Sequence, residues 1–318
     1  MYSKFIFPFL LIWVALIGGY IVKRKGYLAE KLSNPIIKTV ILFGQPIIIC
    51  LAFWVVRIPN IHILTLPLVG LVLSILLYLV GKIFSDFHNH NFKDKGAYLS
   101  CCMFSNIGLS LGGFICFLLF GEQGLGLAIF YSIYSSPLFY TVGFYIARFY
   151  AKSGERSWIK NLKSFFNDPL SIVPNVALIV GLILNFSNIA RPQFFTLLNN
   201  ILIPLTTFLY MFSIGLTIKF AKIKKYFNEC LSISFLKFII NPIIGLSLAY
   251  LFVRMNILDT LSLKVIFIES AMPVAISSLI LSSLFKLNKD LTNSCWVFTT
   301  FITAPWISLI YWIMKAFG

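Results

Sequence analysis

The chain has 318 residues, of which 59% are hydrophobic and 11% charged, and its mean hydropathy is +0.92. A water-soluble protein of this composition would expose large apolar patches, so the composition excludes an ordinary soluble domain. The net charge of +16 would suggest nucleic-acid binding in a soluble protein, but here the basic residues fall in short connectors between apolar runs, so no nucleic-acid partner is expected.

Ten apolar runs are long enough to cross a bilayer as helices of about 20 residues. In chain order the predicted spans are residues 5–22, 33–56, 63–81, 97–120, 124–147, 169–187, 195–218, 231–253, 264–285 and 291–314. The first run is predicted to be a span and not a secretory signal, because no small-residue cleavage site follows it. Open sheets are excluded because hydrocarbon offers unpaired backbone groups no partner. The expected class is an all-α membrane protein.

The basic residues predict how the spans are oriented. Eighteen Lys and Arg residues lie in the odd-numbered connectors and four in the even-numbered ones, if Lys264 at the first position of span 9 is counted with the connector before it. The positive-inside rule therefore places the odd connectors in the cytoplasm and both termini outside. Lys38 and Lys237 are expected to snorkel to the cytoplasmic ends of spans 2 and 8. The expected location is a bacterial inner (plasma) membrane.

The two halves of the chain resemble each other. The basic connector 151–168 separates residues 1–150 from residues 169–318, and each half contains five predicted spans. The pairs that recur at similar offsets are residues 13–19 with 175–181, Pro46 with Pro204, Pro67 with Pro242, Pro137 with Pro305, and Glu122 with Asp290. Because five spans is an odd number, the second half must enter the membrane from the opposite side. The sequence therefore predicts two inverted five-helix repeats, as in many secondary transporters.

Two predicted spans carry helix-breaking sequences at corresponding places. Span 4 contains Ser105-Asn106-Ile107-Gly108-Leu109-Ser110, and span 9 contains Glu269 followed by Ala271-Met272-Pro273. Close glycine packing in span 4 and a simple proline kink in span 9 are the alternatives. The matched positions favour a pair of broken helices, whose free backbone groups can bind a ligand at mid-membrane.

At these residues the chain resembles the auxin efflux carrier family, which shares the fold of bile acid:sodium symporters. The motifs are Asn106 with Gly108, residues 121–124 (Gly-Glu-Gln-Gly), Pro204 with Gly215, Pro242, and Ala271-Met272-Pro273. The resemblance implies a scaffold that rocks against a core of crossed helices 4 and 9, a homodimer, and organic-anion substrates such as auxin, malonate or malate. The chain departs from the family pattern at Gly113, where a proline is usual, and at Ser277 and Ser278, where asparagine is frequent.

The expected function is secondary active transport of a small mono- or dicarboxylate by alternating access. The residues expected to bind the substrate are Asn106, Gly108, Ser110, Met272, Pro273 and Ser277. No Arg or Lys is expected at mid-membrane, so the anion would be recognised by helix N-termini and polar side chains. Tyr131 and Tyr134 either line the cavity or serve as packing residues.

Glu269 is the only acidic residue predicted well inside a span, and a membrane carboxylate is a functional residue by default. A symporter could hold Na⁺ there with the oxygens of Ser105, Asn106, Ser132, Ser135 and Ser136. The Ser-Asn pair and the Glu-x-x-Met spacing also resemble the sodium site of bile acid symporters. Coupling to H⁺ through the same carboxyl, or simple pairing of Glu269 with Lys264, are the alternatives.

Enzymatic functions are not expected. His62, His88 and His90 lie in connectors, where His88 and His90 are expected to be solvated, and no phosphate-binding loop is present. The six cysteines form no zinc or disulfide pattern. No cofactor is expected beyond a coupling Na⁺ or H⁺. An uncoupled channel or uniporter stays open as the alternative, and a membrane-embedded enzyme is a more distant one.

Overall fold

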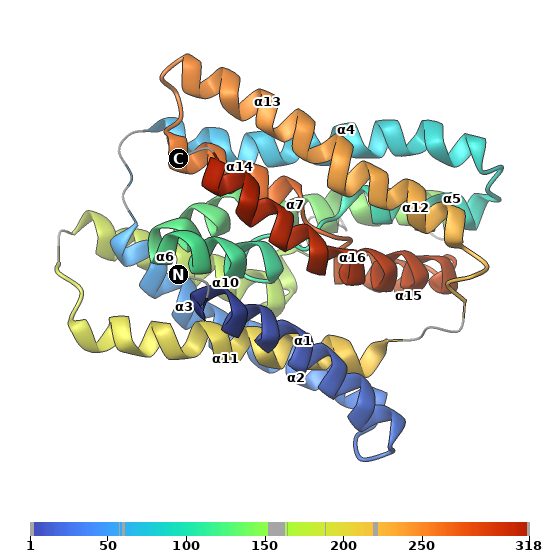
Figure 1. The fold of residues 1–318 in the computed structure, drawn as a ribbon, viewed down its shortest axis with the longest axis horizontal. Coiled ribbons are helices and arrows are strands. Elements are labelled where there is room, and N and C mark those ends of the chain that lie inside the picture. The colour runs from blue at the N-terminus through green and yellow to red at the C-terminus, as the bar shows by residue number, and fades with distance from the viewer. Residues whose placement is uncertain are drawn as a thin grey trace. The chain divides into compact units, whose positions relative to one another are not determined.

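The computed structural model describes residues 3–56, 58, 61–151, 163, 165–187, 189–218 and 222–316. Within these residues the regular elements are helices, and extended pairing is limited to one isolated bridge (Figure 1). The helices are α1 (Ser3–Arg24), η1 (Glu30–Leu32), α2 (Ser33–Thr39), η2 (Val40–Gly44), α3 (Gln45–Val55), η3 (Ile61–Leu64), α4 (Thr65–Phe87), α5 (Phe92–Met103), α6 (Leu111–Ser132), α7 (Ser135–Leu138), η4 (Phe139–Gly143), α8 (Phe144–Ala151), α10 (Pro169–Phe186), α11 (Gln193–Thr217), α12 (Phe227–Phe235), η5 (Leu236–Ile240), α13 (Asn241–Arg254), α14 (Thr260–Ser270), α15 (Ile276–Leu284) and α16 (Lys289–Ala316).

Each of the ten predicted spans falls on one or more of these helices. In the described part of the chain, six helical stretches are long and apolar enough to cross a membrane: Glu30–Val55, His62–Phe87, Leu111–Ala151, Pro169–Phe186, Gln193–Thr217 and Phe227–Arg254. The predicted all-α class is therefore confirmed. The count of ten spans and their inverted symmetry stay predictions, and the termini and most of the connector 151–168 lie outside the described residues.

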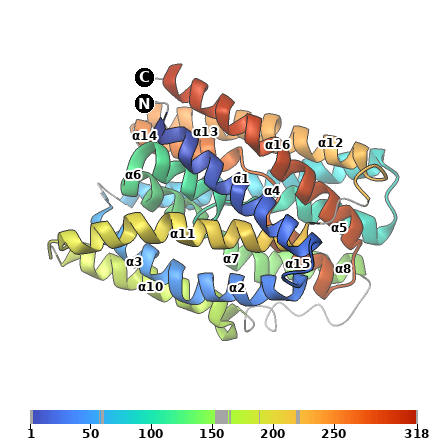
Figure 2. The same ribbon diagram turned by 60° about the horizontal axis from the view of Figure 1, so that its bottom comes forward.

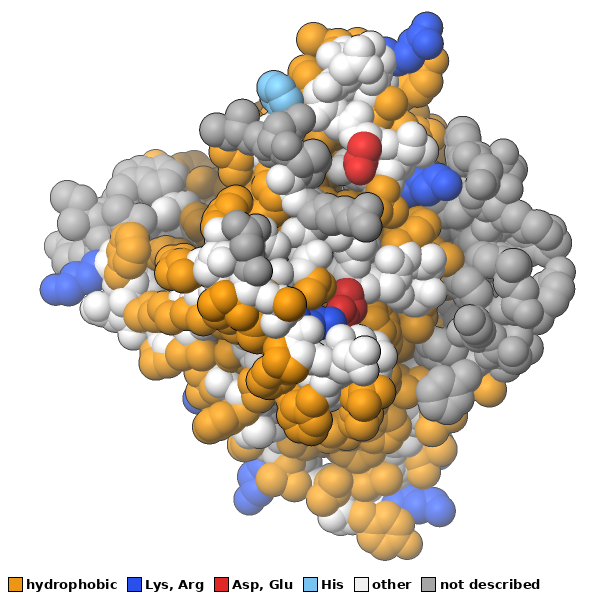
Figure 3. All heavy atoms as spheres, turned by 90° about the vertical axis from the view of Figure 1, so that its left-hand side faces the viewer, with side chains coloured by type: hydrophobic (Ala, Val, Ile, Leu, Met, Phe, Trp, Pro, Cys, Tyr) orange, Lys and Arg blue, Asp and Glu red, His pale blue; other side chains and the backbone are white. Residues whose placement is uncertain are grey.

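Apolar side chains line the outside of several helices. Along α4, Leu68, Val72, Ile75, Leu79 and Ile83 are between 42% and 58% exposed and recur every three or four residues, so they share one face. In Figure 3 hydrophobic side chains outnumber charged ones on the face that is shown. A helix face of this composition is suited to lipid and not to water.

The chain folds into two compact units, and each draws on both halves of the sequence. Unit 1 comprises Met1–Pro59, Gly108–Ile129 and Phe166–Ile218, and unit 2 comprises Asn60–Ile107, Phe130–Phe165 and Lys219–Gly318. The predicted boundary near residue 150 is therefore not a boundary between compact units. The boundary near residue 150 divides the two predicted repeats of the sequence, and a repeat does not have to coincide with a compact unit.

Unit 1 is held by two pairs of packed helices. α1 lies along α11 and α3 lies along α10 (Figure 1), and Figure 2 shows the same pairs from a second direction. A Cβ atom on Gly19 would overlap the Phe212 carbonyl oxygen, and one on Gly215 would overlap the Leu16 carbonyl oxygen. The backbones of α1 and α11 therefore approach closely at these glycines, as small residues permit in membrane proteins.

A buried ion pair joins α6 to the connector between α10 and α11 inside unit 1. The Arg191 guanidinium donates to both carboxylate oxygens of Glu122, and its side chain is only 4% exposed. Arg191 Nη1 also donates to the Leu51 carbonyl oxygen at 2.8 Å, and Asn199 Nδ2 donates to Glu122 Oε1 at 2.6 Å. The neighbouring Gly121 has φ +66°, so the chain turns there within α6. The Gly-Glu-Gln-Gly motif thus supplies a turn and a buried anchor.

In unit 2, α4 packs on α5 and α13, α13 packs on α14, and α12 packs on α16. The π turn η5 ends directly before Asn241-Pro242, and in unit 1 the π turn η2 ends directly before Gln45-Pro46. The wider π turn before a proline accommodates the missing helical hydrogen bond, because the proline nitrogen has no hydrogen to donate. Pro204, which the sequence paired with Pro46, lies inside the continuous helix α11. The paired prolines therefore differ in local structure.

The two adjacent glycines of α1 should respond differently to alanine. Gly19→Ala should lower the stability of the protein by about 1–3 kcal/mol, because its new methyl group would overlap backbone atoms of α11. Gly18→Ala is the matched control, since its nearest neighbour would be Phe212 Cδ2 at 4.0 Å. Thermal unfolding in detergent measures the difference. Equal midpoints for the two variants would contradict the close packing of α1 on α11.

Glu122→Gln should destabilise the protein by about 3–5 kcal/mol, because it leaves the buried Arg191 guanidinium without a counter-charge. The control is Asp290→Asn, which breaks the ion pair with Lys222 in which both side chains are 54% exposed. Water screens such a pair, so the control should change stability little. Denaturant or thermal unfolding of the purified variants provides the comparison, and a control as unstable as Glu122→Gln would contradict it.

Candidate functional site

The helix of predicted span 4 is interrupted between α5 and α6. α5 ends at Met103, and α6 begins at Leu111. Gly108 has φ +64°, a conformation that side chains disfavour, so the break requires a glycine there. A Cβ atom on Gly113 would overlap the Gly108 carbonyl oxygen. The chain's departure from the family pattern at Gly113 is therefore explained by close contact between the two glycines.

The helix of predicted span 9 is interrupted between α14 and α15. α14 ends at Ser270, and α15 begins at Ile276. Pro273 has no amide hydrogen and cannot continue a helix. The carbonyl oxygen of Ser270, left free by the break, accepts a hydrogen bond of 2.6 Å from Asn241 Nδ2. Both interruptions occur at the residues that the sequence predicts.

The stretches of backbone at the two breaks are hydrogen-bonded to each other in unit 2. The amide of Asn106 donates to the Pro273 carbonyl oxygen at 2.8 Å, and the amide of Ala275 donates to the Phe104 carbonyl oxygen at 3.1 Å. Ser105 and Val274 form the isolated antiparallel bridge between these bonds. Each broken helix therefore supplies partners for backbone groups of the other, which hydrocarbon does not do.

Lys237, in the π turn η5, lies at this crossing. Its side chain is fully buried, and its ammonium donates to the Cys102 carbonyl oxygen at 2.7 Å, the Phe104 carbonyl oxygen at 3.2 Å and Ser105 Oγ at 2.8 Å. An ammonium has three donors, and all three are used. The two carbonyl groups lie at the end of α5, where a positive charge also interacts favourably with the helix dipole. Lys237 thus stabilises the broken end of α5.

The prediction that Lys237 snorkels to the membrane surface is wrong, because its side chain is buried at the crossing of the two breaks. The sequence placed Lys237 six residues inside the predicted span 231–253, where its long side chain reaches either the surface or the protein core. One signal was available, because Lys237 is the only charged residue of that span before its end at Val253. The direction in which the Lys237 side chain points depends on whether the core offers carbonyl groups that accept its hydrogen bonds, and only the fold shows this.

Glu269 is fully buried in the last turn of α14. Tyr131 and Tyr134 lie within electrostatic range of its carboxyl group, and their rings pack edge to face with centroids 6.0 Å apart. The Tyr134 hydroxyl also shares a hydrogen bond of 2.9 Å with Ser74 Oγ. Gly70 makes room for the ring of Tyr134, because a Cβ atom there would overlap it. Tyr131 and Tyr134 thus belong to the surroundings of the buried carboxyl.

The remaining predicted site residues lie in both compact units. Asn106, Met272 and Pro273 are buried at the crossing in unit 2, and Ser277 is half-buried in the first turn of α15. Half-buried serines flank the junction of α6 and α7 in the same unit, at Ser132, Ser135 and Ser136. Gly108 and Ser110 belong to unit 1. The structure therefore brings Ser105, Asn106 and Pro273 together at the crossing and leaves Gly108 and Ser110 in a separate unit.

Comparison with known proteins identifies the family. A family model described as membrane transport protein matches residues 5–311. An uncharacterized transporter of Methanocaldococcus jannaschii is 28% identical over 313 residues, which cover 96% of this chain and 97% of the relative. An uncharacterized transporter of Methanothermobacter thermautotrophicus is 25% identical over 304 residues, covering 94% of each chain. Since the match covers nearly every helix described above, the chain belongs to the membrane transport protein family of the auxin efflux carriers.

Proposed function

We propose that this protein is a secondary active transporter that moves a small organic anion, a mono- or dicarboxylate, across the plasma membrane by alternating access. Membership of a membrane transport family supports transport. The observation that carries the choice of an anion is the ammonium of Lys237, which is buried where two broken helices cross. A fixed positive charge within a mostly apolar protein attracts an anion and repels a cation.

The half-helix α15 supports the same choice. It begins at Ile276, directly after the crossing, and its first amide groups point away from the body of the helix with a partial positive charge. Asn106 and Ser277 are the polar side chains closest in sequence to the crossing that can fix the orientation of a carboxylate. In the proposed transporter these groups bind the substrate, together with Met272 and Pro273 from the predicted set. Gly108 and Ser110, which belong to unit 1, stay predicted substrate-binding residues.

The proposal retains the predicted architecture of ten spans in two inverted repeats, with both termini on the outer, non-cytoplasmic side of the membrane. A homodimer is the expected assembly. The two compact units are proposed to move as the two bodies of alternating access, since backbone hydrogen bonds within unit 2 hold its two breaks together and close glycine contacts within unit 1 hold α1 on α11.

The proposed coupling ion is H⁺ and not Na⁺. The set of oxygens expected to bind sodium includes Ser105 Oγ, which accepts a hydrogen bond from the Lys237 ammonium. A sodium ion there would lie next to a fixed positive charge and compete with it for oxygens. Glu269 is the proposed proton carrier, because a proton removes the cost of a buried carboxylate charge and the hydroxyl groups of Tyr131 and Tyr134 lie close to it.

Reconstituted protein should accumulate labelled mono- or dicarboxylates in response to an imposed pH gradient and not to a sodium gradient. Glu269→Gln should still exchange substrate across the membrane but should no longer accumulate it, because the amide cannot carry the coupling proton. Glu30→Gln, which changes an exposed carboxyl in η1, is the matched control and should behave as the wild type.

Three results would count against this proposal. Accumulation driven by sodium would restore Na⁺ as the coupling ion. Transport that follows neither gradient but shows saturation and counterflow would indicate a uniporter, and flux without saturation or counterflow would indicate a channel. A panel of carboxylates that produces no flux at all would reject the substrate class.

Lys237→Met should lower stability by about 2–5 kcal/mol, because the buried Cys102 carbonyl group loses its ammonium donor and the Phe104 carbonyl group keeps only the Ala275 amide, while the side-chain volume is nearly kept. The same variant should lose stabilisation by the transported anion. Lys224→Met, at an exposed position of unit 2, is the control and should keep both properties. Thermal unfolding with and without the carboxylate measures them. The proposed role of Lys237 fails if its variant unfolds and responds to the anion as the control does.

A further inference from the structure

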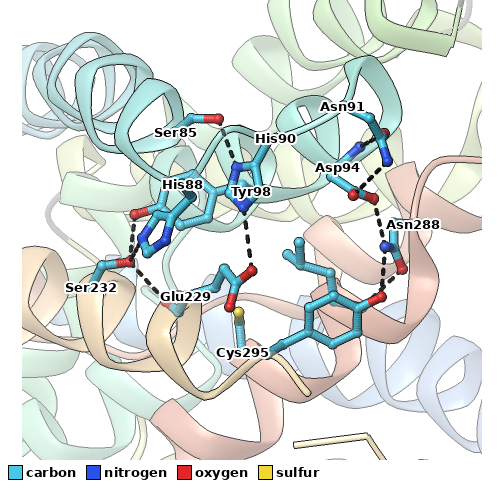
Figure 4. A network of polar contacts seen from close by, with 12 residues as sticks. Ser85, His88, His90, Asn91, Asp94, Tyr98, Glu229, Ser232, Asn288 and Cys295 are labelled. Atoms are coloured by element: carbon cyan, nitrogen blue, oxygen red, sulfur yellow. Dashed lines mark hydrogen bonds and ion pairs between the residues drawn. The ribbon is translucent and has the colours of Figure 1, made fainter.

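A group of polar side chains at the N-terminal end of α12, the end away from Lys237, plays no part in the proposed transport mechanism. His88 and His90 lie in the turn between α4 and α5, and Glu229 lies in the first turn of α12. One ligand atom from each of the three lies within 4.8 Å of the other two. Figure 4 shows His90 pointing toward the carboxylate of Glu229, with His88 beside it. All three residues belong to unit 2.

His90 is oriented as a metal ligand would be. Its side chain is only 4% exposed, so the prediction that it is a solvated loop residue is wrong. Its Nδ1 atom shares a hydrogen bond of 2.8 Å with the buried Ser85 hydroxyl, while its Nε2 atom is buried without a hydrogen-bond partner. A histidine that binds a metal through one nitrogen is usually held by a hydrogen bond at the other. Ser85 supplies that bond, and Nε2 faces Glu229.

The separation of the proposed ligand atoms fits a small transition metal ion. His90 Nε2 lies 3.5 Å from Glu229 Oε1, longer than an ordinary hydrogen bond. Two ligands that are each about 2 Å from a tetrahedral zinc ion are about 3.4 Å apart. The ring of His88 stacks on that of His90, with centroids 5.2 Å apart, and its Nε2 atom shares a hydrogen bond of 3.1 Å with Ser232 Oγ. Both rings are therefore held in place before an ion arrives.

The charges also suit a divalent cation. The Glu229 carboxylate lies beside the two imidazoles and supplies a negative charge that attracts a cation. A neutral imidazole has the lone pair that a metal requires. The neighbouring carboxylate of Asp94 accepts hydrogen bonds from Asn91 and Asn288, both at 2.6 Å, and is thus already engaged.

We propose that His88, His90 and Glu229 form a binding site for a transition metal ion of the zinc class. Two imidazoles and one carboxylate leave a fourth position for water or another ligand. A bound ion would fasten the α4–α5 turn to α12, the helix that continues through η5 to Lys237. On the proposed topology the site faces the cytoplasm, since it is built from odd-numbered connectors and the start of α12.

The test uses full-length protein purified without a polyhistidine tag, stripped with a chelator and titrated with ZnCl₂. One zinc ion per chain should bind and raise the unfolding temperature, while MgCl₂ and CaCl₂ should not, because hard cations require more oxygen ligands. His90→Gln and Glu229→Gln should each abolish this binding. Ser85→Ala should weaken it about 10-fold to 100-fold by removing the bond that orients His90. His62→Ala, at an exposed histidine, is the matched control and should bind zinc normally.

Absorption spectra of the Co²⁺-loaded protein give a second measurement that does not depend on transport. Tetrahedral cobalt bound by nitrogen and oxygen should produce visible bands that disappear in folded His90→Gln and Glu229→Gln protein. If either variant fails to fold, the spectrum of the wild type still decides, because a strong sulfur-to-cobalt band would show that some of the six free cysteines bind the ion. That band, zinc binding that survives both substitutions, or no zinc binding by the wild type would each overturn the proposal.

Discussion

A backbone that leaves its helical path inside a membrane protein must find partners for every amide and carbonyl group that it frees. The structure meets this constraint at one crossing in unit 2, where the broken ends of α5 and α14 bond to each other through Asn106 and Pro273. The Cys102 and Phe104 carbonyl groups at the end of α5 also accept hydrogen bonds from the Lys237 ammonium. This single buried cation therefore permits the interruption on which the proposed binding site depends.

Lys237 and Glu269 are the charged residues with no exposed surface in the described part of the chain, and both belong to unit 2. Their surroundings differ in kind. Lys237 has carbonyl and hydroxyl oxygens around its ammonium, which stabilise its charged form. Glu269 has tyrosine hydroxyl groups nearby. This difference is the reason for proposing a fixed role for the lysine and a proton-carrying role for the glutamate.

Unit 1 is stabilised by different means. Its helices approach through Gly19 and Gly215, and the buried pair of Glu122 and Arg191 anchors the turn within α6. Neither contact uses a residue of the proposed binding site. A unit held in this way suits the proposed alternating access, in which one body keeps its shape while another moves.

The proposed metal site and the crossing lie at two points of one helical run, since α12 carries Glu229 and continues into the π turn that carries Lys237. An ion that restrains the start of α12 would restrain that run as a whole. The same helix thus connects the turn between α4 and α5 with the broken end of α5.

The sequence by itself determined the membrane class, the helical segments and the places where two helices break. These properties follow from local causes: apolar runs of bilayer length, a glycine that permits a positive φ at Gly108, and the missing amide hydrogen of Pro273. The burial of Glu269 also followed from the sequence, because a carboxyl in the middle of an apolar span lies away from water. The family was recognisable from the same motifs.

Only the tertiary structure decided where the long or ambiguous side chains go. Lys237 reaches either a membrane surface or a protein core, and His90 is solvated in a connector unless another helix covers it. The proline pattern suggested pairs that differ in local structure, because η2 and η5 precede Pro46 and Pro242 and not their predicted partners. Each outcome depends on atoms that are far apart in sequence, the carbonyl groups of α5 for Lys237 and the start of α12 for His90. Those separations are set by packing, which local pattern does not encode.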